Sequence, residues 1–315
     1  MSLRIVNGWR DLPTEARGAS VALGNFDGVH RGHRLVIAEA AKAARALKAP
    51  LGVIRFTPHP AALLRPDAEP YLLMTPGQQA RALEALGVDL LYDLPFDQIT
   101  VLTDEAFARD VLAAGPHGGL GARHVAAGFD IRFGHGRSGD AESLKRLGEQ
   151  YGFSVSIAPR VDEDGAKLSS SAAREAVRAG EVDKAAKILG RPFAIEGVVV
   201  EGQHLGRKLG YPTANVFLGD YVRPRLGSYA TRTRLPDGRV VPGVANIGQN
   251  PTTGLVDARL EVWLFDFDED LYGQTIETEL VAFLRPEAKF DSLDELIRVI
   301  GEDAAAARAM LCPEL

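Results

Sequence analysis

The pattern of apolar residues changes near Gly190, and this change constrains the fold more than any other feature of the sequence. Before it, stretches of helical spacing alternate with short apolar runs at residues 21–23, 51–56, 89–92, 123–127 and 154–157. In the first of these stretches Val36, Ala40 and Ala44 recur at helical spacing, and a further helix is expected over residues 78–86. Strands separated by helices predict a mostly parallel sheet with helices on its faces.

After Gly190 the strand-like runs follow one another with no helix between them, at residues 194–200, 229–235, 239–244, 259–267 and 277–284. The turn Pro236-Asp237-Gly238 joins two of them and is a strong hairpin signal. Consecutive strands predict an antiparallel barrel or sandwich. A final helix is expected after Ser292, which has the capping-box spacing to Glu295. The apolar face of this helix comprises Leu293, Leu296, Ile300, Ala304 and Ala307.

A chain of 315 residues is longer than a usual single domain, so two domains are expected. We place the boundary between residues 187 and 188, giving an α/β domain over 1–187 and a β-rich domain over 188–315. No low-complexity linker separates them. The two domains are therefore expected to abut.

Charge and composition narrow the class of ligand. The net charge of −6 and the lack of a dense Lys/Arg tract argue against a nucleic-acid partner, so the substrate is expected to be small. The single cysteine, Cys312, excludes a disulfide framework and a cysteine-based zinc site. We see neither a signal peptide nor a run long enough to span a membrane, and we expect a soluble, cytoplasmic protein with no membrane partner.

The segment Leu23–His33 predicts a phosphate site, because a glycine-rich turn joins a strand directly to a helix. His30 and His33 are three residues apart, so both imidazoles can face a phosphate at the helix start and stabilise charge that develops on it. Paired metal ligands and a plain loop remain alternatives. The spacing does not match the G-x-G-x-x-G fingerprint of dinucleotide-binding proteins.

Three serines at residues 169–171 open a predicted helix that carries Arg174. Serines at a helix start are most often N-caps. Their hydroxyls and the guanidinium could equally bind nucleotide phosphates. Both interpretations stay open from the residues alone.

A second candidate site lies in Gly206–Asn215. Two basic residues and two glycines precede a turn fixed by Pro212, after which Thr213 and Asn215 point to the same side of an extended segment. Hydroxyl and amide oxygens suit Mg²⁺. An ordinary solvent-facing turn is the alternative.

Glu261 stands in the run Leu260–Phe265, which is apolar on both faces and predicts a buried strand. A carboxylate in such a strand is costly unless it is hydrogen-bonded or functional. Partial desolvation would raise its pKa and suit a general base. A purely structural partner for Glu261 is the alternative.

The motifs named above resemble those of the prokaryotic bifunctional riboflavin kinase/FAD synthetase family, in family order and over residues 18–308. GNFDGVHRGH contains the HxGH signature of nucleotidyltransferases, and FTPHP resembles the F-x-PHP element. LSSSAAR resembles ISSTxIR, and PTAN is the hallmark of riboflavin kinases. GVANIG, LEVWLFDFDEDLYG and RPEAKF match further elements of the kinase half. The sequence departs from the family pattern at three places. Ile131 stands where the family usually has Phe, Ser171–Ala173 where it has Thr-Arg-Ile, and Asn250–Thr253 where it has Arg-Pro-Thr-Phe.

The resemblance implies a Rossmann-like nucleotidyltransferase domain followed by a six-stranded antiparallel riboflavin kinase barrel with a C-terminal helix. It implies phosphorylation of riboflavin to FMN and adenylation of FMN to FAD, with Mg²⁺ accompanying ATP and with FMN and FAD as substrates or products. Self-association is expected to be weak at most. A homologue that keeps one activity, and a non-catalytic flavin-binding protein on the same scaffold, are the rival interpretations.

The resemblance also assigns roles to residues. Glu261 is implied as the kinase base, and His30, His33 and Arg174 as the catalytic residues of adenylation. Thr213 and Asn215 are implied as magnesium ligands. The residues implied to bind flavin are His59, Asp130, Arg132, Asn246 and Arg285. The residues implied to bind ATP are Gly24, Asn25, Phe26, Gly32, Ser170, Ser171, Gly206, Arg207, Lys208 and Gly210.

Overall fold

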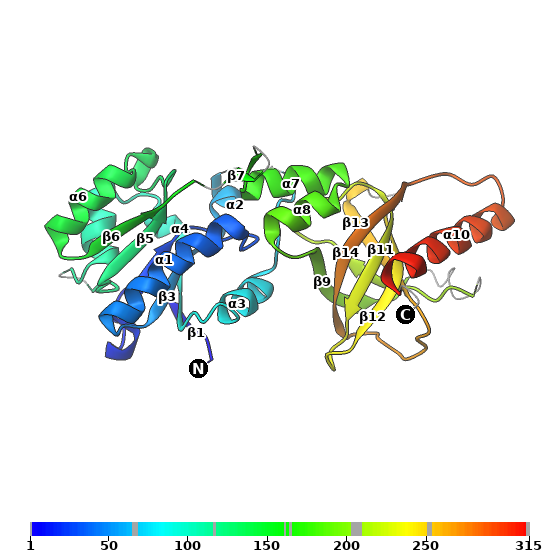
Figure 1. The fold of residues 1–315 in the computed structure, drawn as a ribbon, viewed down its shortest axis with the longest axis horizontal. Coiled ribbons are helices and arrows are strands. Elements are labelled where there is room, and N and C mark those ends of the chain that lie inside the picture. The colour runs from blue at the N-terminus through cyan, green and yellow to red at the C-terminus, as the bar shows by residue number, and fades with distance from the viewer. Residues whose placement is uncertain are drawn as a thin grey trace. The chain divides into compact units, whose positions relative to one another are not determined.

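The computed structural model describes residues 2–64, 69–115, 118–160, 162–163, 166–202, 210–250 and 254–312. Contacts divide the chain into two compact units (Figure 1). The first unit comprises Met1–Ala68 and Pro76–Leu168, and the second comprises Glu69–Thr75 and Ser169–Leu315. The predicted boundary at residue 188 stays a prediction; by contacts, residues 169–187 group with the second unit.

The first unit contains a six-stranded parallel sheet in the order β1-β4-β3-β2-β5-β6. Its strands are β1 (Arg4–Asn7), β2 (Ser20–Leu23), β3 (Leu51–Thr57), β4 (Leu90–Pro95), β5 (His124–Gly128) and β6 (Ser154–Ala158). Its α-helices are α1 (Arg31–Leu47), α2 (Pro60–Leu64), α3 (Pro76–Glu84), α4 (Phe96–Ile99), α5 (Asp104–Phe107) and α6 (Ala141–Tyr151). The short hairpin β7 (Asp162–Glu163) and β8 (Ala166–Lys167) follows.

Helix α1 covers one face of this sheet, against β2, β3, β5 and β6 (Figure 1). Its buried residues Val36, Ala40 and Ala44 are those at the predicted helical spacing, with Ile37 in addition. Strand β2 is buried along its whole length and β3 over its first five residues, as expected for the centre of a parallel sheet. The predicted α/β fold class is confirmed.

The order of the strands creates a switch point beside β2. The chain passes from β2 outward through β3 and β4, and then returns to the other side of β2 to add β5 and β6. In open parallel sheets, ligands bind outside the carboxyl ends of the strands at such a point. The loop 24–30 leaves the carboxyl end of β2, so the topology places this loop at the preferred binding position.

The second unit contains a closed six-stranded barrel in the order β10-β13-β12-β11-β14-β9. Its strands are β9 (Phe193–Val200), β10 (Ala214–Phe217), β11 (Gly227–Arg234), β12 (Val240–Asn250), β13 (Gly254–Leu264) and β14 (Thr275–Pro286). The predicted hairpin at Pro236-Asp237-Gly238 joins β11 to β12. The prediction of a six-stranded antiparallel barrel is confirmed.

Helices α7 (Ser170–Ala179) and α8 (Val182–Leu189) pack beside this barrel and contact β9 and β14 through α8. Val182, Ala185, Ile188 and Leu189 are the buried residues of α8. The backbone amide of Arg225 donates to the Val177 carbonyl at 3.3 Å, which ties α7 to the segment before β11. These two helices therefore belong to the hydrophobic structure of the second unit.

The last helix, α10 (Leu293–Leu311), begins after Ser292, whose hydroxyl accepts from the amide of Glu295 as predicted. The carboxylate of Glu295 accepts from the amide of Asp291 instead of Ser292. Ala304, Ala307 and Leu311 pack with Ala230, Val244 and Phe265 of the barrel. Leu293 lies at the exposed end of the predicted apolar face. Among the described residues, no helix is long and apolar enough to cross a membrane.

The packing of α8 generates a prediction about fragments. A fragment covering residues 169–315 should unfold at a higher temperature than one covering 192–315, because only the longer fragment retains the four buried residues of α8. Burial of each large apolar side chain is worth about 1.5–3 kcal/mol, so the midpoints should differ by roughly 10 °C or more. Thermal unfolding followed by circular dichroism measures both midpoints. Equal midpoints would show that α7 and α8 are dispensable for the barrel.

Candidate active sites

The loop between β2 and α1 has an unusual backbone conformation. Phe26, Gly28 and Val29 all have positive φ, at 53°, 83° and 40°. A Cβ on Gly24 would lie 3.3 Å from the Phe26 ring, which folds back against it and is buried. Non-glycine residues rarely adopt positive φ, and such conformations cluster at ligand sites.

His30 is the N-cap of α1, where its Nδ1 accepts from the backbone amide of His33 at 3.2 Å. Because Nδ1 is the acceptor, the proton of the neutral ring resides on Nε2. The side chain is 94% buried, with a relative exposure of 6%. The cap therefore fixes both the orientation of the ring and the nitrogen that can donate to a ligand.

The two histidine rings stack, with centroids 3.5 Å apart and planes inclined by 22°. The edge of Phe26 packs on His33 at 5.1 Å. A Cβ on Gly32 would lie 3.0 Å from the His30 ring and 3.1 Å from the Leu168 carbonyl oxygen. Gly32 is thus required for the close approach of the His30 ring, and the structure brings His30 and His33 together as predicted.

A polar network of Gln79, Arg55 and Asp93 holds the same loop at Asn25. The Gln79 amide donates to the Asn25 carbonyl at 2.9 Å, and Arg55 donates to the Gln79 side-chain oxygen at 3.3 Å. Arg55 also forms a buried ion pair with Asp93 at 2.5 Å. The side-chain oxygen of Asn25 is buried and accepts no hydrogen bond within the described part of the chain. Asn25 is therefore held by its backbone, while its buried amide oxygen has no hydrogen-bond partner among the described residues.

The predicted flavin residues of this half lie at the same edge of the sheet. His59 follows β3, and its Nδ1 accepts from the Ala61 amide at 3.2 Å. Asp130 follows β5, the other neighbour of β2. Arg132 pairs with Asp140 at 3.3 Å, and Asp140 caps α6. The sheet order thus gathers His59 and Asp130 on the two sides of the His30 loop.

Ser169 is the N-cap of α7, where its hydroxyl accepts from the Ala172 amide at 3.2 Å. One of the three serines thus fulfils the capping alternative, and Ser170 and Ser171 stand in the first turn. Arg174 Nε donates to the Tyr71 carbonyl at 2.7 Å, and its guanidinium lies 5.8 Å from the Tyr71 ring. Roles of Ser170, Ser171 and Arg174 in catalysis stay predictions.

In the second unit, strand register builds a row of polar residues across five strands. Glu261 on β13 is paired with Asn215 on β10 and with Asn246 on β12. Ser228 on β11 is paired with Asn246 and also with Arg285 on β14. Directly paired residues present their side chains to the same face of a sheet. Four of these five residues are predicted site residues.

The row borders a cavity of about 230 Å³ between the barrel and α10. Its polar lining includes Ser228, Asn246, Glu261 and Arg285. Aromatic and apolar walls come from Tyr211, Trp263, Phe290, Leu296 and Ile300. The Tyr211 ring meets Trp263 edge-on at 4.8 Å. An apolar cavity with a few convergent polar groups is the usual form of a small-molecule site.

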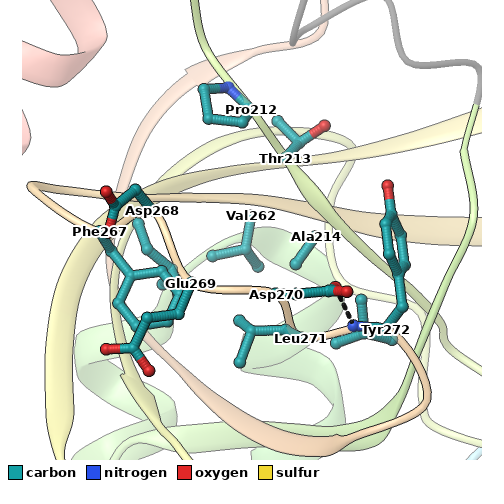
Figure 2. A pocket seen from close by; sticks show the side chains of 12 residues that line it. Pro212, Thr213, Ala214, Val262, Phe267, Asp268, Glu269, Asp270, Leu271 and Tyr272 are labelled. Carbon is teal, nitrogen blue, oxygen red and sulfur yellow. Dashed lines mark hydrogen bonds between the residues drawn. The ribbon is translucent and has the colours of Figure 1, made fainter.

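A second, larger cavity of about 500 Å³ lies beside the first, and Thr213 borders both. Figure 2 shows Pro212, Thr213 and Ala214 on one side and the segment 267–272 on the other. The Asp270 carboxylate accepts from the Tyr272 amide at 2.9 Å, which stabilises this segment. The larger cavity is lined by Val262 and Leu264 and the smaller one by Glu261 and Trp263, so the two open on opposite faces of β13 and share Thr213.

Glu261 is not in a strand buried on both faces, so this part of the prediction is wrong. Leu260, Val262 and Leu264 are buried on one side of β13, whereas Glu261 and Trp263 point to the other side, where the cavity opens. Glu261 is accessible to solvent there. The apolar string misled because Trp263 lines the cavity and does not pack in the barrel interior.

The surroundings nevertheless raise the pKa of Glu261. Partial desolvation by the cavity walls is the main cause, and the positive charge of Arg259, two residues away on the same face, opposes it. Glu261 forms no hydrogen bond or ion pair within the described ranges. A carboxylate with a raised pKa and no protein partner is suited to accept a proton from a ligand.

Asn215 is 6% exposed, and its amide donates to the Thr213 carbonyl at 3.4 Å. A Cβ on Gly202 would lie 2.5 Å from that amide, so a glycine is needed there. In the described ranges no three His, Cys, Asp or Glu side chains form a metal site. The ATP-binding residues Gly206, Arg207 and Lys208 lie outside the described residues, and Gly210 is described but borders neither cavity.

Sequence reasoning missed several residues of these sites. Ser228, Tyr211 and Asp303 line the smaller cavity, and Gln79 holds the loop at Asn25. Ser228 could have been found only from the strand register. Asp303 could have been noticed as a charge beside the apolar face of the last helix.

Two family models match the chain, FAD synthetase over residues 12–172 and riboflavin kinase over 189–311. A bifunctional riboflavin kinase/FMN adenylyltransferase of Pseudomonas fluorescens is 40% identical over 313 residues, which are 99% of each chain. That of Escherichia coli K12 is 38% identical and covers 97% of each chain. A crystal structure described as a macrolide-efflux protein from Streptococcus pneumoniae has a TM-score of 0.83 and 33% identity, over 96% of this chain and 98% of that one.

The environment of Glu261 generates a titration prediction. Its carboxyl should titrate above the ordinary value of 4.5, being protonated below the raised pKa and ionised above it. Arg259→Gln should raise that pKa further, because it removes the positive charge that favours the ionised form. Carbon-13 NMR of the side-chain carboxyls measures both values, with Glu261→Gln identifying the signal. A pKa at or below 4.5, or a decrease in Arg259→Gln, would contradict this account.

Proposed function

Because the chain belongs to the bifunctional riboflavin kinase/FMN adenylyltransferase family, we propose that the loop after β2 serves FMN adenylation and that the outer face of the barrel serves riboflavin phosphorylation. The observation that carries the kinase proposal is the row Asn215–Glu261–Asn246, of which Glu261 and Asn246 line the smaller cavity, while Thr213 borders both cavities. The chain makes FMN from riboflavin and FAD from FMN.

In the kinase site, the smaller cavity takes riboflavin, because its aromatic and apolar walls suit a flat ring system. The larger cavity takes ATP. Thr213 then stands where the terminal hydroxyl of riboflavin meets the γ-phosphate. Glu261 accepts the hydroxyl proton while the oxygen forms its bond to phosphorus and the bond between that phosphorus and ADP breaks.

The oxygen donors of Thr213 and Asn215 fit the hard cation Mg²⁺, which takes most of its remaining ligands from phosphates and water. When bound, the ion neutralises charge on the nucleotide phosphates. The close approach of Gly202 to Asn215 keeps that amide in place. Asn215 is consequently a positioned ligand and not a mobile surface group.

In the adenylation site, a phosphate oxygen of FMN attacks the α-phosphorus of ATP and pyrophosphate leaves, so no strong base is required. His30 Nε2–H donates to the oxygen on which charge develops, and the cap on Nδ1 holds this donor in place before substrate binds. The free amide oxygen of Asn25 accepts from a donor of the nucleotide. Ser170, Ser171 and Arg174 are proposed to bind the remaining phosphates, and His59, Asp130 and Arg132 the flavin.

Both activities follow from one assay in which the protein converts riboflavin and Mg-ATP, and chromatography separates FMN from FAD. Formation of FMN without FAD would indicate that the chain keeps one activity. Binding of riboflavin without turnover would indicate a flavin-binding protein. We propose further that the protein acts on these small molecules in the cytoplasm, without a nucleic-acid partner and with weak self-association at most.

The cap at His30 allows its two roles to be separated. His30→Ala should lower the rate of FAD formation from FMN by roughly 10²–10³-fold, as expected for one lost donor to a developing charge. His30→Asn retains an N-cap acceptor for the His33 amide but lacks the Nε2–H donor. It should therefore lose as much activity as His30→Ala while keeping a higher melting temperature.

Riboflavin kinase activity is the internal control, because that site lies in the other unit. Normal FAD formation by His30→Asn would show that the imidazole acts only as a cap. An equal loss of both activities would point to a general folding defect.

Glu261→Gln tests the kinase base. The amide keeps the volume but cannot accept a proton at neutral pH, so kcat for riboflavin should fall by about 10²–10⁴-fold. FMN adenylation should persist. The melting temperature should not fall, because a raised pKa means that the fold disfavours the ionised carboxylate.

Glu279→Gln is the matched control. Glu279 is another barrel carboxylate whose pKa is raised mainly by burial, but it lies on β14 and borders neither cavity. Its replacement should leave kcat within about two-fold, as for surface changes away from a site. Full turnover in Glu261→Gln, or an equal loss in Glu279→Gln, would remove Glu261 from the mechanism.

A further inference from the structure

An ion pair joins the end of β14 to the middle of α10. Arg285 Nε lies 3.1 and 3.0 Å from the two carboxylate oxygens of Asp303, and Arg285 Nη2 lies 2.9 Å from Oδ2. Nη1 donates to the Pro286 carbonyl at 3.2 Å. Asp303 is 8% exposed. A bidentate pair with a carboxylate this buried is a strong and directional contact.

The pair lies where the burial of α10 changes: residues of the helix are fully buried only from Asp303 onward. From Ala304 to Leu311 the helix has buried apolar residues that belong to the core. From Leu293 to Glu302 no residue is buried. Asp303 is thus the first buried residue of α10, and the helix N-terminal to it has only half-buried and exposed residues besides this contact.

The N-terminal half of α10, Leu293–Glu302, forms one wall of the smaller cavity. Leu296 and Ile300 line the cavity and are half-buried. They lie seven and three residues before Asp303, on the face of the helix that Asp303 shares. A rotation of the helix about its packed end would therefore move both side chains away from the cavity.

We infer that Asp303 is a positioning residue, which through Arg285 holds the wall Leu296/Ile300 against the flavin ring. The inference rests on the proposed use of this cavity for riboflavin. Contacts with Asp303 and with the Pro286 carbonyl already fix the orientation of the Arg285 guanidinium. In this proposal Arg285 acts on riboflavin through α10, and the contact between the wall and the flavin ring is apolar.

Asp303→Asn tests this inference in the full-length enzyme. The KM for riboflavin should rise roughly 10-fold while kcat changes little, because the wall contacts the ring and not the reacting hydroxyl. Glu302→Gln is the matched control: it breaks the exposed Arg298–Glu302 pair one residue away on the same helix. It should leave the KM unchanged. Equal KM values for Asp303→Asn, Glu302→Gln and the wild type would overturn the inference.

A double-mutant cycle separates positioning from direct binding. If Arg285 acts through Asp303, then Arg285→Gln, Asp303→Asn and the double variant should all raise the riboflavin KM to a similar extent. If Arg285 binds riboflavin itself, Arg285→Gln should exceed Asp303→Asn, and the two effects should multiply. That second outcome would overturn the inference.

Leu296→Ala with Ile300→Ala covers the case in which Asp303→Asn fails to fold. Both residues are half-buried and lie outside the core cluster, so the variant should stay folded while the KM for riboflavin rises as in Asp303→Asn. A normal KM in the Leu296→Ala/Ile300→Ala variant would equally overturn the inference.

Trp263→Phe tests the cavity itself, since Trp263 lines it on the barrel side. An unchanged KM in Trp263→Phe would remove the proposed riboflavin site, whereas a raised KM there with a normal Asp303→Asn would remove the positioning role alone.

Discussion

The register of β13 between β10 and β12 is the constraint on which the kinase half depends. Closure of the barrel fixes this register, because each strand is paired on both sides and a shift by one residue would turn every side chain to the opposite face. Asn215, Glu261 and Asn246 therefore stand in one row although they are far apart in sequence. The outer face of the barrel packs against the C-terminal half of α10 and carries the polar row beside the cavity under its N-terminal half.

The adenylation half uses a different device, in which backbone geometry positions the chemistry. The loop after β2 carries three residues with positive φ and is held by Gln79 through a carbonyl group. The close approach of Gly32 allows the His30 ring to cap the helix and to stack on His33. Its strain is sustained by a buried sheet on one side and the polar network of Arg55 and Asp93 on the other.

The sequence predicted both fold classes, because each half has one dominant periodicity that does not conflict with its turns. It also predicted the pair His30/His33, whose spacing is local. It failed at Glu261, because the residues Leu260–Leu264 do not reveal that Trp263 lies outside the barrel interior and lines a cavity. Ser228 and Asp303 were missed for a related reason. Their places depend on pairing with Asn246 and Arg285, which are set by the closed barrel and by a helix packed across it.

The proposed kinase and adenylation sites use different residue types, a carboxylate and an imidazole, because the two reactions differ in the charge that changes. Phosphoryl transfer to a hydroxyl must remove a proton, and the proposed base Glu261 suits this need because a half-open cavity raises its pKa without leaving it inaccessible. Adenylation of a phosphate has no such proton, and the proposed donor after β2 is the neutral imidazole of His30, held by its cap to the His33 amide. A carboxylate at that position would repel both phosphates, and an imidazole at the position of Glu261 would add a positive charge beside Arg259. Each residue type therefore suits the charge that changes at its own site.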